Sequence, residues 1–289
     1  MTDKAVPQHD AQLGALPPGQ RSLYARAKQA IGRALFALSG YERIHIIGCS
    51  RSGTTMLHLA MTCFQNTTIS EEETEVEYPY LGERLQLLMR SGYRPHPKFY
   101  VTKRIHGWFQ PDHIARLLNA TRKEKIGLIH LVRDPRDVLL SRYAGFDQPY
   151  VTAEHWYNSI VAADTIFSSV GPGTRTLTLR YEDLVLAPES TQKAIEARFG
   201  MRQDPSAFTI DRVRDNFERG QVRFKDFALR NLKGLRNAEA SSIGQWKKGE
   251  RVRIGDVAPH VAQRLSEFSA KYGYEPIGSQ SSEKARIYE

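Results

Sequence analysis

The sequence predicts an α/β fold, namely a single domain with a P-loop-like parallel sheet and helices on both faces. Short apolar runs typical of buried strands alternate with helical patterns along residues 42–272, as in parallel sheets whose strands are linked by helices. One stretch, IIGCSRSGTTMLHL at residues 46–59, passes from an apolar run into the glycine spacing of a phosphate-binding loop. A length of 289 residues, of which 40% are hydrophobic, suffices for one large core.

The domain is predicted to span residues 21–289, with its core at about 42–272. Residues 1–20 are polar and rich in Pro and Gly, and we expect them to be disordered. Residues 21–38 place apolar side chains at helical spacing with basic residues between them, which predicts an amphipathic helix. Such a helix packs on its own domain or lies on an anionic membrane surface. We favour the first and keep peripheral membrane contact as the alternative.

The remaining elements follow in alternation. Runs of apolar and β-branched residues predict strands at residues 43–48, 66–71, 99–105, 125–134 and 174–184. Helical patterns predict helices from residue 54, around 111–120, and over 135–146, 188–199 and 256–274. Residues 211–250 are rich in Arg, Lys and Gly with weak periodicity, so a long loop or lid is predicted there.

The composition favours anionic ligands. The formal net charge is +9 at pH 7, which suits nucleotides, nucleic acid, acidic glycans or anionic lipids without choosing among them. Two cysteines, Cys49 and Cys63, are too few for a disulfide framework, and no run approaches the ~18 apolar residues of a membrane span. The first twenty residues lack the apolar run of a signal peptide. We therefore expect a cytoplasmic protein without a transmembrane segment.

The loop after the first strand is the clearest chemical motif. Gly48 and Gly53 are separated by four residues, and a glycine loop between a strand and a helix turns backbone N–H groups toward a phosphate. Thr54 stands where a triphosphate-binding loop carries lysine, and no clear acidic Mg²⁺ ligand follows the strand at 125–134. Arg51 supplies positive charge instead. The loop is therefore predicted to hold a smaller phosphate without a metal ion.

A second motif follows the strand at 125–134. Arg133 ends the apolar run, Asp134 is suited to cap the next helix, and Pro135 suits that helix's first turn. Arg133 is thus expected at the carboxyl end of a strand, where open α/β sheets bind ligands. Ser141 is expected about two turns into the helix. An arginine fork and a hydroxyl together would hold a second phosphate.

Together, CSRSGTT at 49–55 and LVRDPRDVLLSRY at 131–143 resemble the sulfotransferases that use 3′-phosphoadenosine-5′-phosphosulfate (PAPS), over roughly residues 42–272. LRYEDLV at 179–185 and SSIGQWKKGE at 241–250 support the resemblance. It implies PAPS as cofactor, 3′,5′-ADP as product and no metal. Its implied roles are a 5′-phosphosulfate site at Arg51, Ser52, Gly53, Thr54 and Thr55, a 3′-phosphate site at Arg133 and Ser141, an adenine contact at Tyr181, and a closing loop with Ser242, Lys247 and Lys248.

The resemblance also implies a glutamate base. Arginine in the first loop is similar to tyrosylprotein and carbohydrate sulfotransferases, and ISEEETEV at 69–76 resembles the glutamate-threonine segment of the tyrosylprotein enzymes. Alignment on the Glu-Thr pair selects Glu73 as the base, whereas counting from the loop arginine selects Glu72. Lys103 would be the accessory lysine of the strand at 99–105. His106 is the rival base, because cytosolic relatives use a histidine after a lysine on this strand.

The predicted activity is in-line sulfate transfer to a hydroxyl, on a carbohydrate or a glycolipid. Tyrosine on a peptide is the alternative acceptor, because of the ISEEETEV segment. A nucleotide kinase is disfavoured by the absent loop lysine. A nucleic-acid-binding module is motivated by the +9 charge alone, without a base-reading or stacking motif, so no nucleic-acid partner is expected. The sequence carries no signal for an oligomeric state.

Overall fold

The computed structural model describes residues 27, 30–31, 34, 40–70, 98–104, 109–124, 126–142, 148–202, 242–248 and 257–277. Contacts divide the chain into two units, Met1–Tyr41 with Tyr78–Pro95, and Glu42–Glu77 with His96–Glu289. The sheet and helices described below belong to the second unit, apart from the first residue of the first strand. Of the helix predicted over residues 21–38, only four residues are described, and these are helical.

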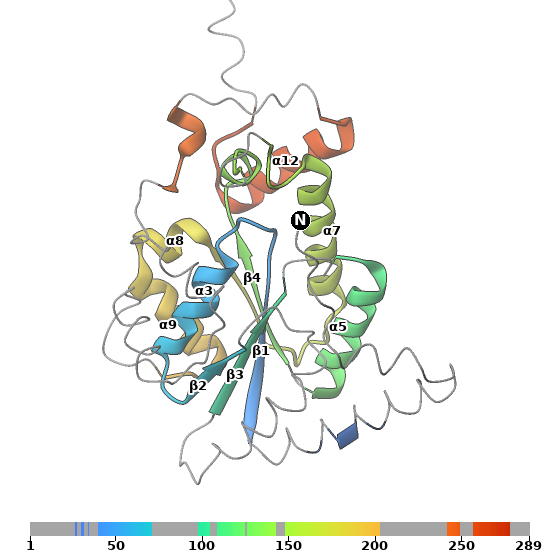
Figure 1. Ribbon diagram of the computed structural model, residues 1–289, viewed down its shortest axis with the longest axis vertical. Coiled ribbons are helices and arrows are strands. Elements are labelled where there is room, and N and C mark those ends of the chain that lie inside the picture. Colours follow the sequence, from blue (N-terminus) through green and yellow to red (C-terminus); the bar gives the residue numbers. More distant parts are fainter. Residues whose placement is uncertain are drawn as a thin grey trace, which may run out of the picture. The chain divides into compact units, whose positions relative to one another are not determined.

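The centre of this unit is a parallel five-stranded sheet in the order β2-β3-β1-β4-β5 (Figure 1). The pairs β1–β4, β2–β3 and β4–β5 are each in parallel register. All six residues of β4 are buried, as its apolar sequence GLIHLV indicates for an inner strand covered on both faces. The strands are β1 (Tyr41–Ile47), β2 (Thr67–Ile69), β3 (Lys98–Lys103), β4 (Gly127–Val132) and β5 (Thr176–Arg180).

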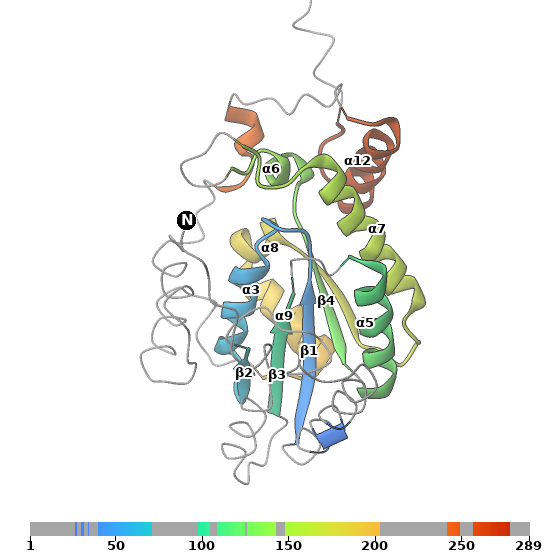
Figure 2. The same cartoon turned by 45° about the vertical axis from the view of Figure 1, so that its right-hand side comes forward.

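Helices cover both faces of the sheet, as predicted (Figures 1 and 2). On one face lie α3 (Thr54–Ala60), α8 (Tyr181–Leu186) and α9 (Pro188–Phe199), and on the other α5 (Pro111–Glu124) and α7 (Ala153–Ser169). Helix α12 (Pro259–Tyr272) packs against α7.

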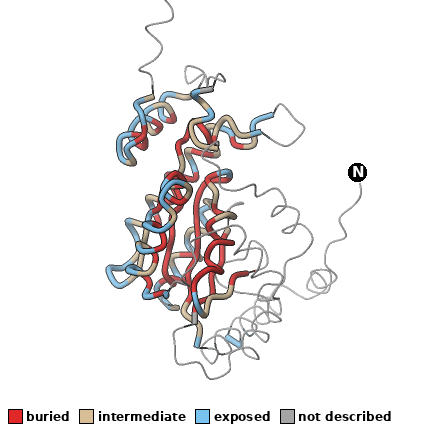
Figure 3. Tube along the Cα trace, turned by 90° about the vertical axis from the view of Figure 1, so that its left-hand side faces the viewer, coloured by how far each residue is buried: buried red, intermediate tan, exposed pale blue. Residues whose placement is uncertain are grey.

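The alternation of side chains along β1 explains the two-sided core. Ile44 and Ile46 pack with residues of α3 and α9, whereas Ile47 packs with residues of α5 and α7. Buried residues accordingly run along the strands and along the inner sides of the helices (Figure 3). The sheet is therefore the rigid frame on which the connecting loops are held.

Two predicted elements differ from the structure, and one helix of the structure was not predicted. Helix α6 (Pro135–Leu139) is far shorter than the predicted 135–146, because the chain turns back after Leu140 and Tyr150 donates its backbone N–H to the carbonyl of Ser141 at 2.7 Å. The strand predicted over 174–184 ends at Arg180, where pairing with β4 stops and α8 begins. Helix α7 was not predicted.

Helix α7 has a clear physical origin. Its N-cap residue Thr152 accepts a hydrogen bond from the backbone N–H of His155, at 3.1 Å. Its apolar face, which includes Trp156, Ile160 and Ile166, is buried at helical spacing. Beyond residues 242–248, the predicted loop or lid at 211–250 lies outside the described residues.

Candidate functional site

The strand order creates a switch point between β1 and β4. The chain leaves β1 toward β2 on one side of the sheet, and leaves β4 toward β5 on the other. Ligands of open α/β sheets bind outside the carboxyl ends of strands at such a point. The loop that follows β1, Arg133 after β4 and Tyr181 after β5 all lie at this edge. The topology therefore brings together the motifs that the sequence analysis selected.

The loop between β1 and α3 is held in an unusual backbone conformation. Arg51 and Gly53 both have left-handed φ angles, of 70° and 89°. The backbone N–H of Ser52 donates to the carbonyl of Cys49 at 3.1 Å, which closes a tight turn. A non-glycine residue in this region is uncommon and marks a site worth examining. The two left-handed residues therefore shape the tight turn that leads into α3.

Both glycines of the loop are required by close contacts. A Cβ atom on Gly48 would lie 2.7 Å from the carbonyl oxygen of Leu131, and one on Gly53 would lie 2.4 Å from Cδ2 of Tyr181. Gly48 therefore lets β1 end against β4, and Gly53 lets the loop lie directly on the Tyr181 ring. The glycine spacing is a steric necessity of this site.

Several polar side chains of the loop are buried. The Ser50, Ser52 and Thr54 side chains are buried, and the Ser50 hydroxyl has no hydrogen-bond partner among the described residues. Thr54 begins α3, whose first turn has no capping side chain and whose first amides have no intrahelical acceptor. Thr55 is half-buried. This arrangement offers hydrogen-bond donors to an anion.

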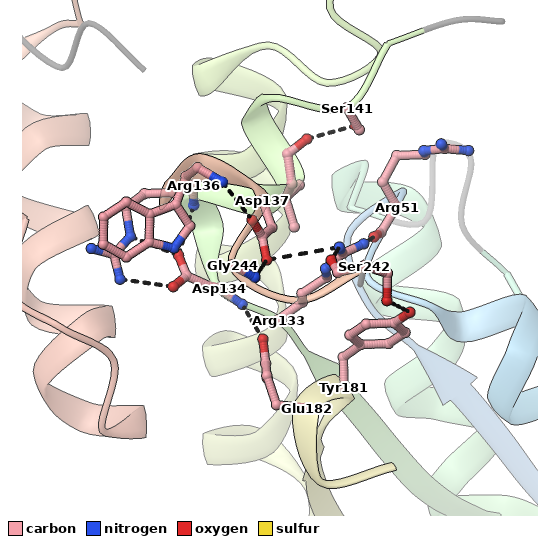
Figure 4. Close-up of polar contacts among 12 residues, drawn as sticks. Arg51, Arg133, Asp134, Arg136, Asp137, Ser141, Tyr181, Glu182, Ser242 and Gly244 are labelled. Carbon is pink, nitrogen blue, oxygen red and sulfur yellow. Dashed lines mark hydrogen bonds and ion pairs between the residues drawn. The ribbon is translucent and has the colours of Figure 1, made fainter. Parts of the chain in front are cut away.

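The side chain of Arg51 is exposed. Its guanidinium lies 5.1 Å from the centre of the Tyr150 ring. In Figure 4 it extends away from Arg133 and Tyr181. Its backbone carbonyl accepts a hydrogen bond from Nη1 of Arg133 at 3.0 Å.

Arg133 is the centre of the polar contacts at this edge (Figure 4). Besides the bond to Arg51, its Nη2 donates to the carbonyl of Ser242 at 2.6 Å. The guanidinium lies over the Tyr181 ring, 4.4 Å from its centre. Its Nε is buried and has no partner among the described residues. Arg133 is thus held in one orientation with a donor remaining.

Tyr181 links the strand end to a distant segment of the chain. It is the first residue of α8, and its hydroxyl forms a hydrogen bond of 2.8 Å with the Ser242 hydroxyl. Ser242 was selected from sequence as a member of the closing loop, and the structure brings it to Arg133 and Tyr181. The acidic first turn of α8 favours a helix start at Tyr181, which explains why the strand ends before it.

The helix after Arg133 begins where the sequence predicts but ends earlier. Asp134 caps α6 by accepting from the backbone N–H of Arg136 at 3.0 Å, and Pro135 occupies the first turn. Ser141, however, follows the end of this short helix, and its hydroxyl donates to the carbonyl of Val138 at 2.6 Å. The prediction that Ser141 lies two turns into a helix is wrong.

Sequence reasoning missed two buried carboxylates. Asp137 accepts from the backbone N–H groups of Gly244 and Trp246, at 2.8 and 3.2 Å. Glu182 accepts from the backbone N–H of Asp134 at 3.0 Å and from the Tyr274 hydroxyl at 2.9 Å. An acidic residue in the first turn of a helix is common for helical reasons alone, so the sequence held no signal that distinguished either one.

The structure describes the side chains of two of the three predicted lysines. Lys247 is exposed and forms an ion pair with Glu275. The side chain of Lys248 lies outside the described residues. Lys103 is buried at the carboxyl end of β3, and its charge adds to the burial that lowers the pKa of His58 to about 3. Glu71, Glu72, Glu73 and His106 also lie outside the described residues.

The thiol of Cys49, next to the loop, is unreactive as a nucleophile at neutral pH. Cys49 directly precedes Ser50 and is buried, and burial raises the pKa of its thiol to about 12. A thiol is a nucleophile only as its thiolate. Cys49 therefore serves packing, against Val132 and Trp156 among others, rather than covalent chemistry.

In the described part of the chain, no three His, Cys, Asp or Glu side chains gather as a metal site would require. Among the same residues, no helix has the length and apolar character needed to cross a membrane.

Comparisons with known proteins agree with this geometry. Residues 70–205 match the model of the sulfotransferase family. The fold is similar to the sulfotransferase domain from the curacin biosynthetic pathway, with a TM-score of 0.59 and 18% identity over 82% of this chain and 99% of that one. It is also similar to the sulfotransferase domain of the Synechococcus PCC 7002 olefin synthase, with a TM-score of 0.52 and 18% identity over 82% of this chain and 97% of that one. No curated protein matches the sequence.

Proposed function

We propose that this protein is a sulfotransferase that transfers a sulfuryl group from PAPS to a hydroxyl acceptor, because residues 70–205 match the model of the sulfotransferase family. The observation that carries the proposal is the glycine loop lying on Tyr181 beside Arg133 at the switch point of the sheet. This edge offers two sets of donors, the loop amides and the Arg133 guanidinium. A nucleotide with separate 5′- and 3′-anionic groups is a ligand of matching chemistry.

The described residues fit such a nucleotide. The Ser50 hydroxyl and the Arg133 Nε are buried without protein partners, so each can bond an external group at no loss of a native contact. The first amides of α3 are free of intrahelical acceptors and lie at the end of the strained turn. The Ser50 hydroxyl and the first amides of α3 would hold the 5′-phosphosulfate. The guanidinium of Arg133 would hold the 3′-phosphate.

Sulfuryl transfer forms a bond between the acceptor oxygen and sulfur as the bond from sulfur to the 5′-phosphate oxygen breaks. The acceptor proton passes to a base, and negative charge grows on the departing 5′-phosphate. Arg51 and the first amides of α3 are suited to stabilise that charge. Lys103, at the carboxyl end of β3, is suited to the sulfonate. No metal is required by this scheme.

The base is proposed to be a glutamate of the segment that follows β2. Ser70 ends the described part of that segment, and its backbone N–H donates to the carbonyl of Val101 at 2.9 Å. The chain therefore leaves the sheet at its carboxyl edge, directly before the glutamates. Glu73 or Glu72 is the proposed base, and His106 is the rival.

The proposed acceptor is a carbohydrate or a glycolipid, with peptide tyrosine as the alternative. Arginine at position 51 supports both, and the ISEEETEV segment favours tyrosine. We also propose a cytoplasmic reaction, because two cysteines in 289 residues are too few for a disulfide framework.

The decisive experiment is calorimetric titration with 3′,5′-ADP, 5′-AMP and ATP, each with and without Mg²⁺. Metal-independent binding that prefers 3′,5′-ADP is expected. A preference for ATP with Mg²⁺ would overturn the proposal in favour of a nucleotide kinase. Transfer of radiolabelled sulfate from PAPS to oligosaccharides, glycolipids and tyrosine peptides then decides the acceptor class, because only the matching class becomes labelled.

A further inference from the structure

Asp137 joins two parts of the chain that are more than one hundred residues apart. Its side chain is fully buried, at 0% exposure, and its two carboxylate oxygens accept from the backbone N–H groups of Gly244 and Trp246. The carboxylate also lies 3.8 Å from Nη2 of Arg133. One side chain thus contacts both the arginine of the proposed 3′-phosphate site and the segment over it (Figure 4).

A second contact docks the same segment on the same short helix. The guanidinium of Arg136 lies 3.5 Å from the centre of the Trp246 ring. Asp134 fixes the orientation of this guanidinium, because its carboxylate accepts hydrogen bonds from Nε at 2.9 Å and from Nη2 at 2.7 Å. A planar cation fixed by a bidentate pair is a suitable platform for an indole ring. The segment at 242–248 is therefore held by two adjacent residues of α6.

Docking of this segment determines what surrounds Arg133. Ser242, at its beginning, accepts from Arg133 through its carbonyl and bonds the Tyr181 hydroxyl through its side chain. Gly244 has a left-handed φ of 68°, which allows its N–H to reach the carboxylate of Asp137. Release of residues 244–246 from Asp137 would remove one restraint on Ser242 and so weaken one of the bonds that orient the arginine.

We propose that Asp137 is a positioning residue for recognition of the 3′-phosphate, acting by docking residues 242–248 and by orienting Arg133. The inference rests on the proposed function, because it assigns a purpose to Asp137 within the same nucleotide site. Asp137 does not touch the nucleotide in this proposal. Its carboxylate accepts from the Gly244 and Trp246 N–H groups, and the Nε of Arg133, which has no partner among the described residues, would donate to the phosphate.

The test compares the dissociation constants of 3′,5′-ADP and 5′-AMP, which differ by the 3′-phosphate alone. In Asp137→Ala, loss of bonds to a charged group is expected to weaken binding of 3′,5′-ADP by about ten- to a hundredfold. The affinity for 5′-AMP is expected to stay within about twofold, the range of changes away from a contact. A purely structural role would weaken both nucleotides together and leave their ratio unchanged, which would overturn the proposal.

Two further variants keep the test decisive if Asp137→Ala folds poorly. Asp137→Asn keeps the side-chain volume and one acceptor oxygen. We therefore expect its preference for 3′,5′-ADP over 5′-AMP to lie between those of Asp137→Ala and the unaltered protein. Trp246→Leu removes the contact of the indole ring with Arg136, and the same selective loss is expected on a smaller scale. The control is Glu42→Gln, which removes a paired carboxylate near the start of β1, at the opposite edge of the sheet, and should preserve the ratio.

The outcomes separate this inference from the function on which it rests. If the unaltered protein binds 3′,5′-ADP no better than 5′-AMP, the proposed function fails. If the unaltered protein prefers 3′,5′-ADP and the Asp137 and Trp246 variants keep that preference, the function stands and the positioning role of Asp137 fails.

Discussion

At the scale of single residues, the loop after β1 depends on the absence of side chains as much as on their presence. Gly53 lies against the Tyr181 ring, which in turn supports the guanidinium of Arg133. A side chain at position 53 would therefore displace the Tyr181 ring and, through it, the guanidinium of Arg133. The positive φ of Gly53 adds a separate backbone requirement, because residues with a Cβ are strained there.

Gly53→Ala is expected to lower the free energy of unfolding by about 2–4 kcal/mol, from overpacking and backbone strain together. Urea denaturation measures this loss. Gly171→Ala is the matched control, since a Cβ there meets nothing within 4 Å and its φ is not positive. Equal free energies of unfolding for the two variants would show that the Tyr181 ring moves aside without loss of stability.

Arg133→Ala is expected to weaken binding of 3′,5′-ADP by about ten- to a hundredfold, because a charged hydrogen-bond donor is removed from the 3′-phosphate. Calorimetry measures the change. Arg122→Ala removes an exposed arginine of α5 and serves as the control for net charge. Unchanged affinity in the Arg133 variant would contradict the assignment of the 3′-phosphate site.

Glu73→Ala is expected to leave binding of 3′,5′-ADP intact while the turnover number falls by about 10²–10⁴-fold, since a general base acts on the acceptor proton alone. Glu72→Ala is the paired variant. Steady-state sulfate transfer decides between them, because only the variant that lacks the base loses turnover. Full activity in both would transfer the role to His106.

At the scale of elements, α7 shows how a local signal and tertiary burial combine. The helix has a clear start at Thr152 and a buried face that packs against α5, α6 and α12. It was missed in the sequence because its polar side chains interrupt the apolar pattern, and because α6 was expected to continue through Gly145. The true boundary of α6 depends on the backbone pairing of Ser141 with Tyr150, which no local pattern reveals.

Thr152→Ala is expected to lower the free energy of unfolding by about 1 kcal/mol, because the backbone N–H of His155 loses its capping acceptor. Thr165→Ala, on the exposed side of the same helix, is the control. Its hydroxyl only bonds the carbonyl of Val161 one turn earlier, and its loss should be nearly neutral. Thermal denaturation of the two variants compares them directly.

At the scale of the whole molecule, three buried histidines couple stability to pH. Burial is the main cause that lowers the pKa of His45, His58 and His130 to about 3 each. Nearby cations add to it, Arg43 beside His45, Lys103 beside His58 and Lys271 beside His130. The unfolded chain binds protons on these rings near pH 6.5, whereas the folded chain keeps them neutral down to about pH 3.

The free energy of unfolding is therefore expected to fall at acidic pH. Between about pH 6.5 and pH 3 the unfolded state binds more protons, so stability falls as the pH falls, and above pH 6.5 these groups contribute no slope. Each ring adds up to about 1.4 kcal/mol per pH unit. His130→Leu is expected to reduce the slope by about one such contribution, measured by urea denaturation from pH 7 to pH 4.5. A slope equal to that of the unaltered protein would contradict the neutral state of His130.

The sequence by itself determined the fold class and the first two motifs. Alternating apolar runs and helical patterns are local consequences of burial, and the glycine loop and the turn at Arg133 are short enough to be recognised without distant contacts. For the same reason the cap at Asp134 and the helix at 188–199 were predicted correctly.

Only the tertiary structure decided which distant residues meet at the site. Asp137 and Glu182 became part of it because α6 and α8 start at neighbouring strand ends, and Ser242 because residues 242–248 dock on α6. The end of α6, which leaves Ser141 outside the helix, likewise depends on a contact with residues further along the chain. Such contacts join residues remote in sequence, and their free energy comes from burial and pairing that exist only after the sheet has brought its carboxyl ends together.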